Sequence, residues 1–280
     1  DMMLTNVSEY FRPQTVEEAY ELMQSDKEHS IFLSGGTIVA LMESSRIEKV
    51  IDLKSLRLDT VSVTEDEIVV GATTTVESFR KDQLIRKEFG EFFYEAFSLV
   101  GSWQIRNMAT IGGSIAPKLG WSDVSTCLLV TGSSLMVYGV DGYQRMLISD
   151  YFSLPAGEKP LITHIMLKRD GWYSAFEKFS KTTFDIATVN VGLSIRPEQG
   201  RIKAARVVCG SRPQYPARFE SVESAMADLE INDVMPSIVR SLLYESFVGG
   251  SNMTASFEYR KHLASVLAQR AAEKLKGMIR

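Results

Sequence analysis

The sequence contains few of the residues that build metal or iron–sulfur sites. Its 280 residues include only two cysteines, Cys127 and Cys209, and three scattered histidines. Two cysteines are too few for a zinc tetrahedron or an iron–sulfur cluster, and no two histidines have the spacing of a metal site. Both cysteines lie in apolar surroundings, which favours buried free thiols over a disulfide. We therefore expect no metal site, and any redox chemistry requires an organic cofactor.

Charge and hydropathy argue against two further kinds of partner. The net charge is only −4, and the mildly acidic balance gives none of the basic clustering typical of nucleic-acid binding. No apolar run approaches the roughly 18 residues that span a bilayer. The first eight residues lack the basic start and apolar stretch of a signal peptide. We expect a cytoplasmic protein with no nucleic-acid partner and no membrane span.

The first part of the chain mixes short strands with short helices. Thr15, followed three residues later by Glu18, indicates a helix N-terminus. A strand at 30–33 and another at 49–53 flank a helix-like stretch at 38–43, so the two strands are predicted to be parallel. The pattern also predicts helices at 76–100 and 124–131, a strand at 161–168, and hairpins at 60–63 with 67–70 and at 135–140 with 143–148, the latter around Asp141-Gly142.

The last third of the chain separates strands from helices. After Arg169-Asp170-Gly171, three strands are predicted at 173–180, 187–196 and 202–210, and the pattern is wholly helical after Pro216, most clearly at 257–278. Segregated strands and helices favour an α+β fold. The predicted domains are 1–170, with subdomains 1–55 and 56–170, and 171–280.

Two Gly-Gly pairs are the most informative feature of the sequence. Gly35-Gly36 lies between Ser34 and Thr37, and Gly112-Gly113 lies between Thr110-Ile111 and Ser114. Glycine lets backbone N–H groups converge on an anion, because no Cβ blocks the approach. A helix that starts after the turn would add positive potential. Two such turns would hold a diphosphate from two sides without lysine or arginine.

Each pair also has a simpler interpretation as a plain turn. A third pair, Gly249-Gly250, is interpreted as a linker between helices. Neither of the first two pairs fits the three spaced glycines of a dinucleotide-binding βαβ unit. Neither is followed by the Lys and Ser or Thr of a P-loop.

The ordered set of motifs resembles the flavoprotein subunits of molybdenum hydroxylases, the xanthine dehydrogenase and carbon monoxide dehydrogenase family. Residues 32–37 resemble the first FAD loop of that family, and residues 104–116 resemble its longer second signature. Trp121-Ser122-Asp123, residues 176–187 and residues 255–260 resemble further family segments in the same order. The resemblance covers essentially the whole chain.

The resemblance implies both a fold and a function. The family has a two-subdomain FAD-binding domain of the vanillyl-alcohol-oxidase and MurB-like type, and a smaller C-terminal α/β domain with a three-stranded antiparallel sheet and helices. It implies non-covalent FAD, because Thr37 stands where covalent relatives place a flavin-linked histidine. It implies partners: a large molybdenum subunit and a small iron–sulfur subunit. Electrons would pass from the clusters to FAD and on to NAD or another acceptor.

The resemblance also assigns cofactor-binding residues, and no catalytic ones. Asp123 would accept a hydrogen bond from a ribityl or ribose hydroxyl, Ile162 would pack on the flavin, and Lys178 would lie near the ring. Their alternatives are a helix N-cap, a strand core residue and a solvated lysine. The two loops supply the remaining residues: Ile31, Phe32, Leu33, Ser34, Gly35, Gly36, Thr37 and Ile38, then Thr110, Ile111, Gly112, Gly113 and Ser114.

Some residues depart from the family pattern. Ile38 stands where the family often has Asp or Ser, and Ser114 stands where it usually has Asn. These departures keep open a structural subunit with weak or lost FAD binding. A stand-alone MurB-like flavin reductase is a further alternative, but it requires a general acid and a substrate pocket that the sequence does not show.

Overall fold

The chain folds into two compact units, as the computed structural model of residues 4–155, 157–211 and 215–279 shows. The first unit comprises residues 1–79, 103–117 and 134–167, and the second comprises 80–102, 118–133 and 168–280. The chain therefore passes between the units five times. The last passage, at Leu167 and Lys168, lies beside the predicted boundary, and the predicted domains 1–170 and 171–280 stay a proposal.

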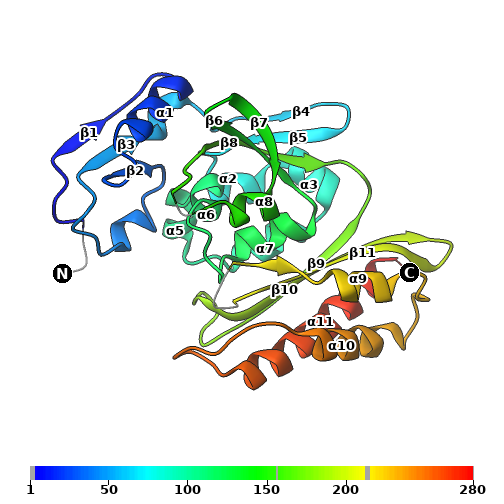
Figure 1. The fold of residues 1–280 in the computed structure, drawn as a ribbon. Helices are drawn as coiled ribbons and strands as arrows, with labels where there is room; N and C mark the ends of the chain where they lie inside the picture. Colours follow the sequence, from blue (N-terminus) through cyan, green and yellow to red (C-terminus); the bar gives the residue numbers. More distant parts are fainter. Residues whose placement is uncertain (1–3, 156, 212–214, 280) are drawn as a thin grey trace. The chain divides into compact units, whose positions relative to one another are not determined.

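The N-terminal part of the first unit is a small parallel sheet with one helix. The sheet has the order β1 (Glu9–Phe11), β3 (Lys49–Asp52), β2 (Ser30–Leu33), and both pairings are parallel, which confirms the prediction for β2 and β3. Helix α1 (Val16–Ser25) begins at Thr15, whose hydroxyl accepts from the Glu18 amide at 3.1 Å, as predicted. Its apolar face is buried, and Figure 1 shows this part in blue.

The remaining strands of the first unit form a five-stranded sheet. Its order is β4 (Val61–Val63), β5 (Glu67–Gly71), β8 (Leu161–Lys168), β6 (Ser134–Gly139) and β7 (Gly142–Leu147). Both predicted hairpins are confirmed, and Gly142 supplies the positive φ of 82° at the second turn. Helix α2 (Val76–Lys81) begins in this unit. The other short helices of the unit are α5 (Trp103–Met108), α6 (Ile111–Ile115) and α8 (Ile148–Ser153), and its two 3₁₀ turns are η1 (Val39–Leu41) and η2 (Leu53–Leu56).

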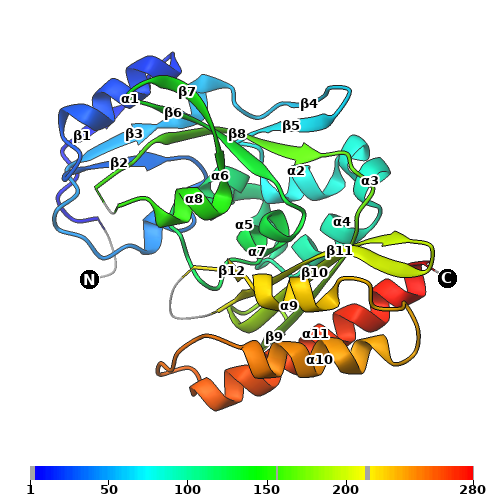
Figure 2. The same cartoon turned by 45° about the vertical axis from the view of Figure 1, so that its right-hand side comes forward.

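The second unit is an antiparallel sheet covered on both faces. The sheet has the order β12 (Ala217–Arg218), β11 (Arg201–Gly210), β10 (Ala187–Glu198), β9 (Tyr173–Ser180). Helices α9 (Glu220–Met226), α10 (Met235–Ser246) and α11 (Phe257–Ile279) pack on one face (Figures 1 and 2). The remaining helices of the second unit are α3 (Gln83–Phe89), α4 (Phe92–Ser98) and α7 (Asp123–Val130).

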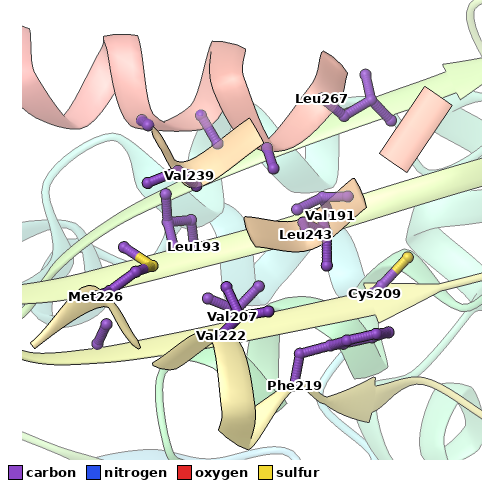
Figure 3. Close-up of a cluster of buried hydrophobic side chains, with 14 of the residues drawn as sticks. Val191, Leu193, Val207, Cys209, Phe219, Val222, Met226, Val239, Leu243 and Leu267 are labelled. Atoms are coloured by element: carbon purple, nitrogen blue, oxygen red, sulfur yellow. The ribbon is translucent and has the colours of Figure 1, made fainter. Parts of the chain in front are cut away.

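Alternation along β10 separates the two faces of this sheet. Val191 and Leu193 point into the core formed with α9, α10 and α11, which Figure 3 shows. Asn190 and Gly192 point the other way, toward α7: a Cβ at Gly192 would lie 2.9 Å from the Val130 side chain. The small and polar residues of β10 therefore make room for α7.

The α+β class is confirmed, but several local predictions were wrong. The helix-like stretch at 38–43 is only the single 3₁₀ turn η1, so no α-helix follows the first glycine pair. The second glycine pair lies inside helix α6 rather than in a loop before a helix. Strand β12 makes a fourth strand of the sheet that was predicted to have three, and the short elements β1 and α8 were missed. Elements this short depend on neighbours that local sequence does not specify.

Two further expectations are confirmed in the described residues. Cys127 and Cys209 are buried free thiols. Gly249-Gly250 lies in the connection between α10 and α11. Within the described part of the chain, no helix combines the length and the hydropathy that crossing a membrane requires.

Candidate functional site

The first glycine turn presents a row of unused backbone donors. It follows β2, which ends at Leu33, and Gly36 adopts a φ of +75° that favours glycine. No hydrogen bond within the described residues uses the amides of Gly35, Gly36, Thr37 or Ile38. These residues are half-buried. Partly buried amides without partners need an acceptor from water or a ligand, so this turn can bind an anion.

Gly35 is required because two distant segments touch at this point. A Cβ on Gly35 would lie 1.8 Å from the carbonyl oxygen of Met108 and 3.1 Å from the Cα of Ala109. Only a residue without a side chain permits such an approach. The predicted approach of the two glycine motifs in space is therefore confirmed, since Ala109 directly precedes Thr110. That the two motifs bind one diphosphate together stays a prediction.

Two amides of the second motif are used by the protein itself. The Ile111 N–H donates to Thr74 O at 2.9 Å, and the Gly112 N–H donates to Ala72 O at 2.8 Å. A Cβ on Gly112 would lie 2.7 Å from the Ala72 Cβ. Gly112 therefore serves the close packing of α6 on residues 72–75. These two amides are therefore used within the protein, and the assignment of Ile111 and Gly112 to the cofactor site stays a prediction.

The remaining polar groups of the second motif surround the start of α6. Thr110 is the N-cap, and its hydroxyl accepts from the Gly113 amide at 3.2 Å. The Ser114 hydroxyl donates to the Thr110 carbonyl at 2.8 Å. Gly113 and Ser114 are half-buried, unlike Ile111. The long capping bond of Gly113 is thus the weakest internal contact of this motif.

A buried ion pair holds α5 beside the start of α2. The Arg106 Nε donates to Glu77 Oε2 at 2.7 Å, and the side chains are only 9% and 5% exposed. Charges this buried persist only when they are paired. Arg106 belongs to the second motif, so one part of that motif fixes the helix that carries Met108 against Gly35. Arg106 lies within the second signature, residues 104–116, but the sequence alone gave it no role.

Ile162 and Phe32 are packing residues of the first unit. Ile162 lies in β8 opposite Val137 and is 5% exposed, which confirms its alternative as a strand core residue. Phe32 packs against the core of α1 and β3. Their predicted contacts with the flavin stay predictions.

In the second unit, Asp123 and Lys178 form a buried ion pair. The Lys178 Nζ donates to Asp123 Oδ2 at 2.7 Å and to Leu99 O at 3.2 Å. Their side chains are 4% and 7% exposed, so Lys178 is not the solvated lysine of the alternative. Nor is Asp123 the N-cap of α7, because the Ser122 hydroxyl accepts from the Ser125 amide.

Asn190 and Thr126 complete this cluster. The Asn190 Nδ2 donates to Asp123 Oδ1 at 2.7 Å, and the Thr126 hydroxyl donates to Asn190 Oδ1 at 2.9 Å. Burial raises the pKa of Asp123, against the lowering effects of Lys178 and then Asn190. Sequence reasoning missed Asn190. Its signal was an amide in the apolar run 187–195, where a side chain of this kind needs a partner.

Metal and thiol chemistry find no support in the described residues. No group of three or more His, Cys, Asp or Glu side chains there lies close enough together to hold a metal ion. Burial raises the pKa of the Cys127 thiol well above its ordinary value, with a further contribution from Asp123. A buried thiol of this kind is unreactive.

Family profiles match almost the whole chain in two consecutive parts. The profile described as "FAD binding domain in molybdopterin dehydrogenase" matches residues 5–167. The profile described as "CO dehydrogenase flavoprotein C-terminal domain" matches residues 174–275. Both glycine motifs and Ile162 fall within the first match, together with Asp123, and Lys178 falls within the second.

Individual relatives resemble the chain over nearly their full length. The nicotinate dehydrogenase FAD-subunit of Eubacterium barkeri is 26% identical in an alignment that covers 90% of each chain. The carbon monoxide dehydrogenase medium chain of Afipia carboxidovorans is 22% identical and covers 98% of this chain and 99% of its own length. Among solved structures, the reconstituted CO dehydrogenase from Oligotropha carboxidovorans has a TM-score of 0.88 at 22% identity, and quinoline 2-oxidoreductase from Pseudomonas putida 86 has 0.87 at 19%. Each alignment covers 99% of both chains.

Proposed function

Because this chain belongs to the family of FAD-binding domains in molybdopterin dehydrogenases, we propose that it is the flavin-carrying, electron-transferring subunit of a molybdenum hydroxylase complex. Its relatives bear names that describe one chain of several, such as "FAD-subunit" and "medium chain". In the proposal, a small subunit supplies the iron–sulfur clusters and a large subunit supplies the molybdenum cofactor. Electrons reach this chain from the clusters and leave to NAD or another acceptor.

The first glycine turn carries the proposal. Its four consecutive unused amides fit a diphosphate, since oxyanions take hydrogen bonds from converging backbone N–H groups. The close approach of Gly35 to Met108 brings the second motif beside the turn. We assign the diphosphate to the amides from Gly35 to Ile38, with the Gly113 amide, whose capping bond to Thr110 is long, contributing from the second motif. No lysine or arginine is needed in this arrangement.

The chain's own side chains do not carry redox chemistry. Both thiols of the chain are buried, and among the described residues no group of three or more His, Cys, Asp or Glu side chains could hold a metal ion. FAD, when bound, supplies the capacity to take up and release electrons that the polypeptide lacks. The residues that surround the cofactor therefore serve to hold it, orient it and set its electrostatic environment.

The second unit contributes charge rather than catalysis in this proposal. The family resemblance assigns Lys178 a position near the flavin, where the positive charge of this buried side chain would favour electron uptake. Asp123 has two acceptor positions filled by Lys178 and Asn190, and a carboxylate has about four. It can therefore also accept from a hydroxyl of the cofactor. Ile162 is assigned a packing contact with the ring.

The absorbance of the purified full chain tests the proposal. We expect a yellow protein with one non-covalently bound FAD, released by denaturation, and co-purification with a large and a small partner chain. A colourless chain that binds no added FAD but still assembles with partners would instead identify a structural subunit. A chain that turns over substrates alone, without partners, would identify a stand-alone reductase.

The electron acceptor requires a separate measurement. If NAD is the acceptor, anaerobic addition of NADH to the purified complex should bleach the visible absorbance of the oxidised flavin. If NADH leaves the spectrum unchanged while the substrate of the complex bleaches it, another acceptor takes the electrons. The cytoplasmic location likewise stays a prediction, which cell fractionation tests.

A further inference from the structure

Helix α5 is attached to the first unit by a charged side chain rather than by an apolar face. Of its six residues only Arg106 is buried. The apolar side chains of Trp103, Ile105 and Met108 are 58%, 41% and 54% exposed. A helix of a globular protein usually packs through an apolar stripe. In α5 the hydrogen bond from Arg106 Nε to Glu77 Oε2 at 2.7 Å takes the place of that packing.

Met108 lies between two points at which its segment is fixed. On the C-terminal side, the Ala109 carbonyl accepts from the Val76 amide at 2.8 Å. On the N-terminal side, Arg106 is bound to Glu77, which follows Val76 in the first turn of α2. The start of α2 therefore holds the segment on both sides of Met108.

The carbonyl of Met108 is the group that meets the first glycine turn. Its oxygen lies only 1.8 Å from the place that a Cβ on Gly35 would occupy. Two residues after Met108, Thr110 caps α6 and accepts from the Gly113 amide. A shift of α5 would move the Met108 carbonyl and then this cap. The distance between the two glycine motifs therefore depends on the direction of α5.

We infer that Arg106, paired with Glu77, is a positioning residue that sets the affinity for FAD by fixing the direction of α5. The inference rests on the proposed function, because it requires the diphosphate of the cofactor at the turn from Gly35 to Ile38. A hydrogen-bonded ion pair holds its two side chains in one direction, whereas an apolar pair of similar volume permits several. The pair acts on the cofactor through the backbone of Met108 and not by touching it.

A double variant of the full chain, Arg106→Met with Glu77→Leu, separates positioning from stability. Replacing a buried ion pair with apolar residues of similar volume is often neutral or stabilising, so the urea midpoint should not fall. Hydrogen exchange of the backbone amides in residues 103–109 should become faster, because α5 is no longer held in one direction. The dissociation constant for FAD, measured by titration, should rise about tenfold, as for the loss of one hydrogen bond to a charged group.

Arg145→Met with Glu67→Leu is the matched control. Arg145 and Glu67 form an ion pair between β7 and β5, in the five-stranded sheet of the same unit. The control should keep wild-type hydrogen exchange in residues 103–109 and wild-type affinity for FAD. Wild-type affinity in the double variant at Arg106 and Glu77, or an equal loss in the control, overturns the inference, while FAD binding by the wild-type chain upholds the proposed function. A wild-type chain that binds no FAD overturns both.

If the double variant does not fold, Glu77→Gln decides. Glutamine keeps the volume and an oxygen acceptor for Arg106, but it lacks the charge that strengthens the hydrogen bond. Weaker FAD binding together with faster exchange in residues 103–109 supports the inference, and wild-type values of both overturn it.

Discussion

Replacing Gly35 with alanine should separate the two segments that form the proposed cradle. The new Cβ would lie 1.8 Å from the Met108 carbonyl oxygen and 2.7 Å from its carbonyl carbon. Real Cβ atoms essentially never approach another atom within 3.0 Å, so the two backbones must part by about 1.2 Å. Because both colliding groups are backbone, no rotamer change relieves the overlap.

The structure sets the size of this effect. Overpacking of a well-packed site costs about 1–3 kcal/mol, and a collision between two backbone segments belongs at the upper end of that range. The displaced segment leads directly into the capping residue Thr110, so FAD affinity should fall in the same variant. We expect the free energy of unfolding to fall by about 3 kcal/mol.

Urea unfolding and FAD titration of the full chain measure the two effects separately. Gly139→Ala is the control, because Gly139 lies in the same unit, has no positive φ, and has open space where its Cβ would be. It should change stability by less than about 0.5 kcal/mol and leave FAD binding intact. Gly35→Ala with the stability and the FAD affinity of Gly139→Ala would refute the close approach and the cradle built on it.

Three further changes have defined outcomes. Gly113→Val should abolish FAD retention, and since its Cβ would lie 2.7 Å from the Thr110 hydroxyl it should also disturb that cap. Normal flavin content in this variant would contradict the prediction. Burial raises the pKa of Tyr151 from 10.0 to about 12, so stability present below pH 10 should be lost as the pH rises through 12, by about 3 kcal/mol. Tyr151→Phe should remove this loss in alkaline unfolding curves. Arg260→Met removes the hydrogen bond from the buried guanidinium to Thr188 O at 2.8 Å. The free energy of unfolding should fall by about 1–3 kcal/mol, which lowers the urea midpoint. An unchanged midpoint would show that the guanidinium does not anchor α11.

Sequence alone determined the features that depend on neighbouring residues. The Thr15 cap, the hairpin turn at Asp141-Gly142 and the long helix α11 follow from short-range chemistry and periodicity, and all three occur. The parallel pairing of β2 with β3 was predicted from the helix-like stretch between them and occurs, although that stretch forms only the 3₁₀ turn η1. The resemblance identified the family because it depends on motifs in a fixed order, which folding does not alter.

Only the tertiary structure decided what each glycine does. Gly35 is a glycine because the Met108 carbonyl lies against it, and Gly112 because α6 packs on Ala72. Gly36 alone of these is fixed by its own φ of +75°. The same dipeptide therefore offers free amides in one place and uses them internally in the other, since the partners of the second pair lie almost forty residues away in the chain.

The buried cluster of the second unit shows the same division. The sequence pointed to Asp123 and Lys178 separately, with a cap and a solvated lysine as their alternatives. The fold pairs them, because α7 lies on the polar face of β10 and β9 runs beside that strand. Periodicity shows which face a residue occupies, but the partner it meets there depends on how distant elements pack, and that information belongs to the folded chain.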